Sequence, residues 1–385
     1  MQKYIEYLFF IILFLIIHTY LIYPVIITII SLLKSGKDYK NYSGKVSVIL
    51  SAYNEEKVIE ARIKNLSELN FDFNKLEVLV GSDNSTDGTN EILKFFSEKY
   101  SWLNIRLFPK RRGKASVLND LVKETRNEIL VFTDANTRFD KDALLHLVSG
   151  FSDESIGGIC GRLVMEESEI SKTHSVEEGF YWKYETFFKK AEGKCDVLIG
   201  ANGGIYAIRR SLFSSIPTRK AVTDDLYLTL SVLNEGKKFI YDYNAVAFED
   251  VALTVKDEFN RKIRFAATNY QTIFNFKKRL FTPGLLSYSL WSHKIIRWLM
   301  PILMLVILAL NIIIMPGSVF FEAIFYLQVI FYLMGIAGFI FASLNLRIRL
   351  FSLVYFFLIS NLALLIGLLR FLRGKHSAVW QSTPR

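Results

Sequence analysis

The sequence predicts an α/β domain with a mostly parallel sheet, flanked by transmembrane helices. Apolar runs long enough to cross a bilayer stand near both ends of the 385-residue chain, at residues 4–33 and within residues 296–370. Between them, short apolar and β-branched segments alternate with amphipathic helical patterns, as expected for a doubly wound sheet. The chain therefore divides into a soluble part and two membrane parts.

The net charge of +10 is distributed unevenly along the chain. Residues 46–260 carry 28 Lys or Arg and 34 Asp or Glu, a net charge of −6, so the remainder carries +16. Because the positive charge lies outside the predicted soluble part, it argues against a nucleic-acid partner. It favours positive-inside anchoring, with the soluble part in the cytoplasm. The basic residues adjoin the apolar runs: Lys34, Lys37, Lys40, Lys45, Lys277, Lys278, Arg279, Lys294 and Arg297.

Residues 1–44 are expected to form a retained transmembrane helix followed by a linker. The apolar run at 4–33 is too long for the core of a signal peptide, and it has neither a strongly basic start nor a small-residue cleavage site.

The soluble part begins with four predicted strands that are separated by helical patterns. Bounding turns and β-branched residues place strands at 45–50, 76–81, 105–108 and 129–132, and apolar periodicity places helices at 58–69, 89–99 and 115–125. In such a sheet the first four strands run parallel.

Three of these strands end in polar turns that carry acids. Tyr53 and Glu55 follow the first strand, Asp83 the second, and Asp134 and Asn136 the fourth. The carboxyl ends of parallel strands meet at one edge, so these turns are expected to form one crevice for a divalent cation or a sugar nucleotide. A polar loop after each strand is the alternative, and Asp87 is as suited to capping its helix as to binding a ligand.

In this order and spacing, the motifs resemble those of family 2 glycosyltransferases, which are inverting, nucleotide-sugar-dependent enzymes with a Rossmann-like GT-A fold. The resemblance covers roughly residues 45–270, and with its membrane helices the chain is similar to poly-N-acetylglucosamine, hyaluronan and cellulose synthases. It rests on SVILSAYNEE, VLVGSDNSTDGT, RRGKASVLN, VFTDANTRFD, GANGGIYAIRR, AVTDDLYLTL and RKIRF.

The resemblance implies a donor site for a UDP-sugar. Tyr53 and Glu55 would hold the nucleobase and ribose, Asp83 the uracil side, and Lys114 would offset the charge of the diphosphate. Asp134 matches the first position of the family's DxD motif, whose second aspartate is replaced by Asn136. An Mg²⁺ or Mn²⁺ ion is implied here, bound more weakly because an amide oxygen supplies no negative charge.

On the acceptor side, Thr223-Asp224-Asp225 matches the family's TED motif. The resemblance makes Asp225 the general base, with Asp224 beside it at the glutamate position. Two adjacent acids at a helix start are by default a cap and a dipole partner. Gly203 and Gly204 would let an acceptor approach the backbone, although a tight turn between strands explains these glycines equally well.

The segment RKIRF occupies the place of the synthases' QxxRW motif. Arg264 would stabilise the diphosphate, and Phe265 stands where the synthases stack a tryptophan on the acceptor sugar. That replacement, together with Arg261 for glutamine, weakens any inference of a polymeric product. A basic juxtamembrane helix is the alternative.

The carboxyl-terminal part is predicted as an amphipathic interface segment at 271–295, about three transmembrane helices within 296–372, and a basic tail at 373–385. Four crossings place both ends of the chain outside, whereas the tail residues Arg370, Arg373, Lys375 and Arg385 favour the cytoplasm. Either one terminal span is re-entrant, or the rule is violated, or the number of crossings differs.

The expected function is transfer of a sugar, N-acetylglucosamine or glucose, from a UDP-sugar to a membrane-associated or polysaccharide acceptor in envelope glycan synthesis, at the plasma or inner membrane. One alternative is a single addition onto a lipid-linked or glycolipid acceptor. Another is a non-catalytic membrane subunit of an export complex, which would have lost the acids at 134 and 225. An accessory membrane subunit is left open as a partner.

Overall fold

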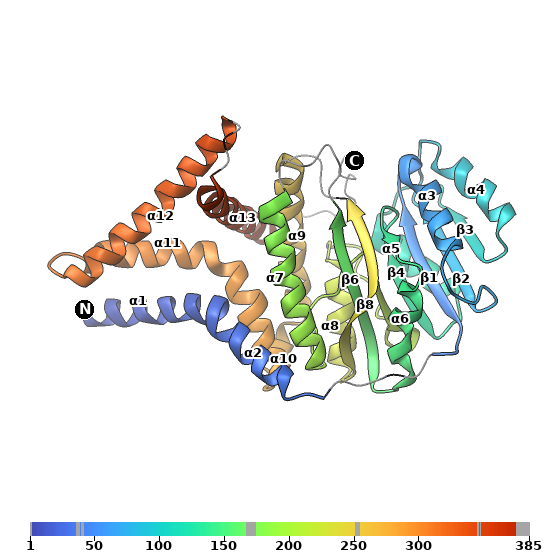
Figure 1. The fold of residues 1–385 in the computed structure, drawn as a ribbon, viewed down its shortest axis with the longest axis horizontal. Coiled ribbons are helices and arrows are strands. Elements are labelled where there is room, and N and C mark those ends of the chain that lie inside the picture. The colour runs from blue at the N-terminus through green and yellow to red at the C-terminus, as the bar shows by residue number, and fades with distance from the viewer. Residues whose placement is uncertain are drawn as a thin grey trace.

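The computed structural model describes residues 2–35, 39, 42–166, 175–250, 255–344, 346 and 348–374. Lys37 and Lys40 of the predicted basic flank, and Lys375 and Arg385 of the predicted tail, lie outside these residues. The described part consists of a soluble α/β domain and a set of long apolar helices beside it (Figure 1).

An eight-stranded sheet in the order β3-β2-β1-β4-β7-β6-β8-β5 forms the centre of the domain. The strands β1 to β4 are parallel, as predicted from the sequence, and β6 is parallel to β8, whereas β7 and β5 run antiparallel to their neighbours. The strands are β1 Val46–Ala52, β2 Leu76–Ser82, β3 Leu103–Leu107, β4 Ile129–Thr133, β5 Arg138–Phe139, β6 Ile156–Glu166, β7 Tyr206–Arg209 and β8 Lys238–Asp250.

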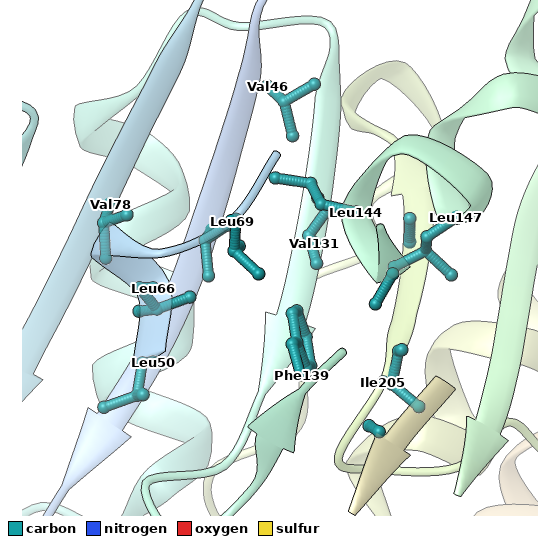
Figure 2. Packing of buried hydrophobic residues seen from close by; sticks show 14 of the residues in the cluster. Val46, Leu50, Leu66, Leu69, Val78, Val131, Phe139, Leu144, Leu147 and Ile205 are labelled. Carbon is teal, nitrogen blue, oxygen red and sulfur yellow. The ribbon is translucent and has the colours of Figure 1, made fainter. Parts of the chain in front are cut away.

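Helices cover both faces of the sheet because its central strands are apolar on both sides. Figure 2 shows one face, where Leu66 of α3 and Leu144 and Leu147 of α6 pack onto Val46, Val131 and their neighbours. On the other face, α5 packs onto β1 and β2, α8 packs onto β6 and β8, and α9 packs against α8. The helices of the domain are α3 Glu56–Ser67, α4 Thr89–Lys99, α5 Lys114–Glu124, α6 Ala143–Ser149, α7 Ser175–Lys194, α8 Asp224–Asn234 and α9 Val255–Asn275.

Four helical stretches are long and apolar enough to cross a membrane: 2–32, 285–314, 319–343 and 349–372. The first comprises α1 Gln2–Ile17 and α2 Tyr23–Leu32, joined by a π-helical segment, His18–Ile22. In the second, α10 Leu285–Ser289 continues through another π-helical segment, Leu290–Ile295, into α11 Ile296–Ile314. Of the segment predicted as a separate interface element, 271–295, the first five residues end α9 and residues 285–295 continue into α11. The last two stretches are α12 Val319–Ser343 and α13 Arg349–Leu372.

A buried polar cluster joins helix α7 of the domain to these apolar helices. His293 lies with its Nδ1 atom 2.6 Å from Glu192, and the hydroxyl of Tyr23 donates to the same carboxylate at 2.7 Å. Two turns earlier on α7, Glu185 is paired with Arg297 at 2.7 Å. Since unpaired charges are costly to bury, these contacts fix α7 against α2 and α11.

Helices α9 and α13 approach each other closely at Gly367. A Cβ atom on this glycine would lie 2.3 Å from Cβ of Ala266 and 2.9 Å from the carbonyl oxygen of Ile263. Neither atom belongs to a flexible side-chain end, so the two backbones are in contact here because position 367 has no side chain.

We predict that Gly367→Ala lowers the free energy of unfolding by about 1–3 kcal/mol, since the added methyl group overpacks this contact. The matched control is Gly179→Ala in α7, where a Cβ would meet no atom within 4 Å. There the better helix propensity of alanine should leave stability unchanged or raise it. Thermal unfolding of both variants in detergent is the measurement, and equal midpoints would contradict the expected contact.

Candidate active site

The ends of β1, β2 and β4 lie side by side, as the parallel register requires. Ala52 pairs with Ser82 and Leu50 with Thr133, so the residues that follow these strands emerge at one edge of the sheet. The amide of Asp83 also donates to the carbonyl of Ala52 at 2.9 Å. The predicted crevice is therefore lined by neighbouring strand ends.

Asp83 is a buried acceptor that fixes the turn before α5. Its carboxylate accepts hydrogen bonds from the backbone N–H groups of Arg112 at 2.8 Å and Gly113 at 2.7 Å. Gly113 has a φ of +86°, a conformation that favours glycine. Both features hold the start of α5, and with it Lys114, beside the end of β4.

Lys114 bridges two of the predicted site carboxylates. Its Nζ atom lies 2.7 Å from Oδ1 of Asp134 and 2.9 Å from Oδ2 of Asp224. Burial on its own would lower the pKa of Lys114, but the two negative charges outweigh it and raise the pKa above its ordinary value. The ammonium group is therefore a fixed positive charge between β4 and α8.

The carboxylates of Asp225 and Asp134 both approach Gly203. A Cβ atom on Gly203 would be 3.2 Å from Oδ2 of Asp225 and 3.8 Å from Oδ2 of Asp134, so any side chain at 203 would fill the space between the carboxylates. At the next position, Gly204, a Cβ would meet Glu249 at 2.6 Å and Thr137 at 2.8 Å. The lack of a side chain at Gly203 and Gly204 thus lets neighbouring side chains lie close to the backbone here.

The Asp225 carboxyl has an unusual protonation equilibrium. Burial, and then the adjacent charge of Asp224, raise its pKa from 3.8 to about 7, although the charge of Lys189 and the N–H of Leu226 act in the opposite direction. A carboxylate with a pKa near neutrality can both hold and release a proton under physiological conditions.

Lys189 and Asn202 form a buried polar contact behind Asp225. The Nζ atom of Lys189 donates to the side-chain oxygen of Asn202, whose amide nitrogen donates to the carbonyl of Gly161 at 2.7 Å. The backbone N–H of Asn202 donates to Sγ of Cys160 at 3.1 Å, and burial raises the pKa of that thiol to about 11. The strand β6 and the helix α7 therefore position the segment that carries Gly203.

Helix α9 positions the acidic segment at the start of α8. The hydroxyl of Thr223 donates to Asn269 at 2.7 Å, and its backbone N–H donates to Thr272 at 3.0 Å. One turn earlier on α9, the guanidinium of Arg264 lies 5.2 Å from the ring of Phe265, which is 42% exposed. RKIRF thus lies on the helix that holds the predicted base.

The turn after β1 carries Tyr53 next to the basic loop. The guanidinium carbon of Arg111 lies 3.6 Å from the centre of the Tyr53 ring, so this arginine covers one face of the ring. The N–H of Glu55 donates to Thr89 at 2.9 Å. Asp87 accepts from the N–H and hydroxyl of Thr89 and from the N–H of Glu56, so it caps the starts of α3 and α4.

Asn136 presents a buried oxygen at the end of β4. Its Oδ1 atom has no hydrogen-bond partner, and a buried polar atom without a partner is a candidate ligand contact. Within the described residues, no group of three His, Cys, Asp or Glu side chains could hold a metal ion. Any cation here would therefore use Asp134, Asn136 and oxygens of the substrate itself.

Sequence reasoning missed three buried polar side chains at the site: Lys189, Asn202 and Arg62. Arg62 is fully buried, donates to Thr133 at 2.8 Å and stacks on Phe139, and burial lowers its pKa to about 9. It lies on the apolar face of α3 between Ile59 and Leu66, where a single cation is the signal that was available.

Residues 47–216 match the family model described as glycosyl transferase family 2. The chain is 30% identical over 254 residues to the probable glycosyltransferase YdaM of Bacillus subtilis (strain 168), covering 62% of this chain and 58% of that protein. It is 28% identical over 239 residues to the beta-monoglucosyldiacylglycerol synthase of Nostoc sp. (strain PCC 7120), covering 60% and 50%.

It is also 22% identical over 233 residues to the poly-beta-1,6-N-acetyl-D-glucosamine synthase of Staphylococcus aureus (strain COL), covering 59% of this chain and 55% of that protein. The chain therefore spans about half the length of the curated relatives it matches. The sequence-based resemblance to family 2 glycosyltransferases is confirmed.

Among solved structures, the mannosyltransferase PcManGT from Pyrobaculum calidifontis, in complex with GDP-Man and Mn²⁺, has a similar fold. The TM-score is 0.72 at 22% sequence identity, with 96% of this chain and 100% of that chain covered. At this identity the similarity concerns the fold alone, and it confirms the predicted GT-A architecture with adjoining apolar helices.

The raised pKa of Asp225 has a consequence for stability. The folded chain retains a proton that the unfolded chain releases between about pH 4 and pH 7, so this residue lowers stability as the pH rises through that window. We predict that Asp225→Asn raises the free energy of unfolding at pH 8 by roughly 2–4 kcal/mol, and that the gain shrinks toward pH 4. Thermal unfolding of the variant and the parent at pH 8 and at pH 4 measures this difference in stability.

Asp87→Asn is the control of opposite sign. Burial alone would raise the pKa of Asp87, but the hydrogen bonds from Thr89 and from backbone N–H groups outweigh it and lower the pKa. Its contribution is therefore present above pH 4 and lost as the pH falls, so this variant should be less stable at neutral pH. A destabilised Asp225→Asn at pH 8 would show that the carboxylate is better compensated than its surroundings indicate.

Proposed function

We propose that the protein is a membrane-anchored, inverting glycosyltransferase, because residues 47–216 match the glycosyl transferase family 2 model. The donor is a UDP-sugar, and the acceptor is a hydroxyl group of a membrane-associated glycan or lipid. One observation carries this proposal: the carboxylates of Asp225 and Asp134 both approach Gly203, and Asp134 is paired with Lys114. A base close to a charged donor site suits direct displacement.

The chemical step needs one base and a stabilised leaving group. Asp225 takes the proton from the acceptor hydroxyl as that oxygen bonds to C1 of the donor sugar. The bond between C1 and the diphosphate oxygen breaks on the opposite face, and UDP leaves with the bonding electrons. A pKa of about 7 makes Asp225 a stronger base than an ordinary carboxylate, while it is still largely ionised above neutrality.

The donor would lie along the strand ends. Tyr53 and Glu55 bind the nucleobase and ribose, and Asp83, whose carboxylate already holds the turn before α5, faces the uracil side. Lys114 and Arg264 offset the charge of the diphosphate. The buried contacts of Asp83 mean that its effect on the donor includes the placement of Lys114.

A divalent cation fits this site through two oxygen ligands. Asp134 has an oxygen facing the gap beside Gly203, and Oδ1 of Asn136 is buried without a partner. When bound, Mg²⁺ or Mn²⁺ would neutralise charge on the diphosphate. Asn136 in place of a carboxylate would weaken its binding, and the solved mannosyltransferase of similar fold contains Mn²⁺.

A lipid-linked or glycolipid acceptor is the second candidate, with one sugar added per acceptor. It is favoured by the similarity to a beta-monoglucosyldiacylglycerol synthase and by Phe265, which is exposed where the polymerising synthases carry tryptophan. The similarity to a poly-beta-1,6-N-acetyl-D-glucosamine synthase favours a polysaccharide product instead. Product length by mass spectrometry, from membranes supplied with a panel of UDP-sugars, separates the two.

We further propose that the catalytic domain lies on the cytoplasmic side. Lys34 follows the first apolar helix, and Lys277, Lys278 and Arg279 precede the next long apolar stretch, 285–314. Positive charge therefore stands on the domain side of both apolar stretches, where the positive-inside rule places the cytoplasm.

We predict that release of UDP rises about tenfold per pH unit below pH 7 and levels off above it, as Asp225 loses its proton. Asp225→Asn should lower turnover by roughly 10²–10⁴-fold and retain UDP binding, measured by calorimetry. Asp87→Asn, whose carboxylate caps helices, should keep the parental pH profile. An active Asp225→Asn, or one with an unchanged pH profile, would rule out the assigned base.

We further predict that Asn136→Asp tightens divalent metal binding, because a second carboxylate adds negative charge at the site. Electron paramagnetic resonance of Mn²⁺ titrated into the protein with UDP present reports free metal without requiring activity. The expected result is about a tenfold lower dissociation constant. An unchanged constant would mean that position 136 does not reach the ion.

A further inference from the structure

We propose that α13 does not cross the membrane but lies along the leaflet that faces the catalytic domain, with the lipid surface as its partner. The proposal rests on the membrane anchoring put forward above. By length and hydropathy α13 is the equal of the other three stretches, so composition alone does not distinguish it. Its packing does.

The carboxyl-terminal half of α13 packs along α9, a helix of the catalytic domain (Figure 1). Gly367 contacts Ala266, and the ring of Phe371 stacks on Tyr270 at 5.9 Å. The hydroxyl of Tyr270 in turn donates to the carbonyl of Trp298 at 2.6 Å, near the start of α11. The end of α13 therefore lies at the level where α11 leaves the domain.

The amino-terminal end of α13 lies on the same side. Helix α11 runs away from the domain and ends at Ile314, and after a short turn α12 returns through 25 residues, about 37 Å. The end of α12 contacts the start of α13, since the rings of Phe341 and Phe351 lie 5.3 Å apart. One crossing outward and one crossing back bring both ends of α13 to the domain side.

A charged contact joins the middle of α13 to helix α9 of the catalytic domain. The Nζ atom of Lys262, on α9, donates to Ser360 at 3.1 Å and lies 3.9 Å from the centre of the Phe356 ring. Glu258, also on α9, is 3.9 Å from the same ammonium group. If α13 crossed, Lys262 and Glu258 would lie near the bilayer centre, where charged groups are costly.

The distribution of charge along the chain also favours a position of α13 on the domain side. The turn between α11 and α12, Met315-Pro316-Gly317-Ser318, has no charged residue, as expected for the side opposite the cytoplasm. Arg349 stands at the start of α13, and Arg370 and Arg373 at its end. Three crossings place all three arginines on the domain side, and the conflict between the basic tail and an even number of crossings disappears.

This placement brings the acceptor side of the site close to lipid. α9 contacts α13 through Lys262 and through Ala266, which lies against Gly367. The same helix holds Thr223 beside Asp225 through Asn269 and Thr272. Helix α9 thus joins the membrane-surface helix to the predicted base.

Substituted-cysteine labelling tests the topology without any activity readout. Ser377→Cys, beyond α13, is compared with Ser35→Cys after the first apolar helix and Ser318→Cys in the turn between α11 and α12. A membrane-impermeant maleimide is applied to inverted and right-side-out vesicles. The two natural cysteines, Cys160 and Cys195, are buried, and the parent protein measures their background.

We expect Ser377→Cys to react from the face that labels Ser35→Cys, and to lose labelling from the face that labels Ser318→Cys. Reaction of Ser377→Cys from the Ser318 side, or from both sides, would overturn the proposal. If all three variants react from both faces, the membrane anchoring itself fails and this proposal fails with it. A glycosyltransferase without activity would leave the labelling result unaffected, so the two failures are distinguishable.

Discussion

The ion pair from Lys114 to Asp134 and Asp224 is the interaction on which the arrangement of the site depends. It joins the end of β4 to the start of α8, two segments that are far apart in the sequence. Lys114 itself is placed by Asp83, which holds the turn before α5 through two backbone N–H groups. The carboxylates of Asp134 and Asp224 are thus positioned by one ammonium group, whose charge also makes their close approach tolerable.

The nearby lysines compensate the negative charge of Asp225 only in part. Lys114 neutralises Asp134 and Asp224, and the charge of Lys189, which contacts Asn202, lowers the pKa of Asp225. Burial and the charge of Asp224 still leave the Asp225 carboxyl partly protonated near neutrality. Asp225, which lies close to Gly203, therefore keeps its proton to a higher pH than an ordinary carboxyl does. Function at such a site is obtained at the expense of stability.

The sequence was sufficient for the parallel half of the sheet and for the grouping of the carboxylates, because both follow from local periodicity and from the rule that parallel strands end at one edge. It did not reveal that β7 runs antiparallel between β4 and β6, since a four-residue strand has no periodicity that records direction. Arg62, Lys189 and Asn202 were missed because burial of a polar side chain depends on tertiary packing. The placement of α13 was likewise inaccessible, because its composition matches that of a crossing helix.

The stacking of Arg111 on Tyr53 bears on how donors are told apart. A nucleobase that binds this ring either uses its other face or displaces a guanidinium that already contributes a cation–π interaction. If the base displaces Arg111, the net free energy gained by stacking is small, because the new base–Tyr53 contact replaces an existing Arg111–Tyr53 contact. Selection among nucleotide donors would then fall chiefly on hydrogen bonding at the edge of the base, so that two nucleotides with equal aromatic area but different edges would be separated more sharply than their stacking energies allow.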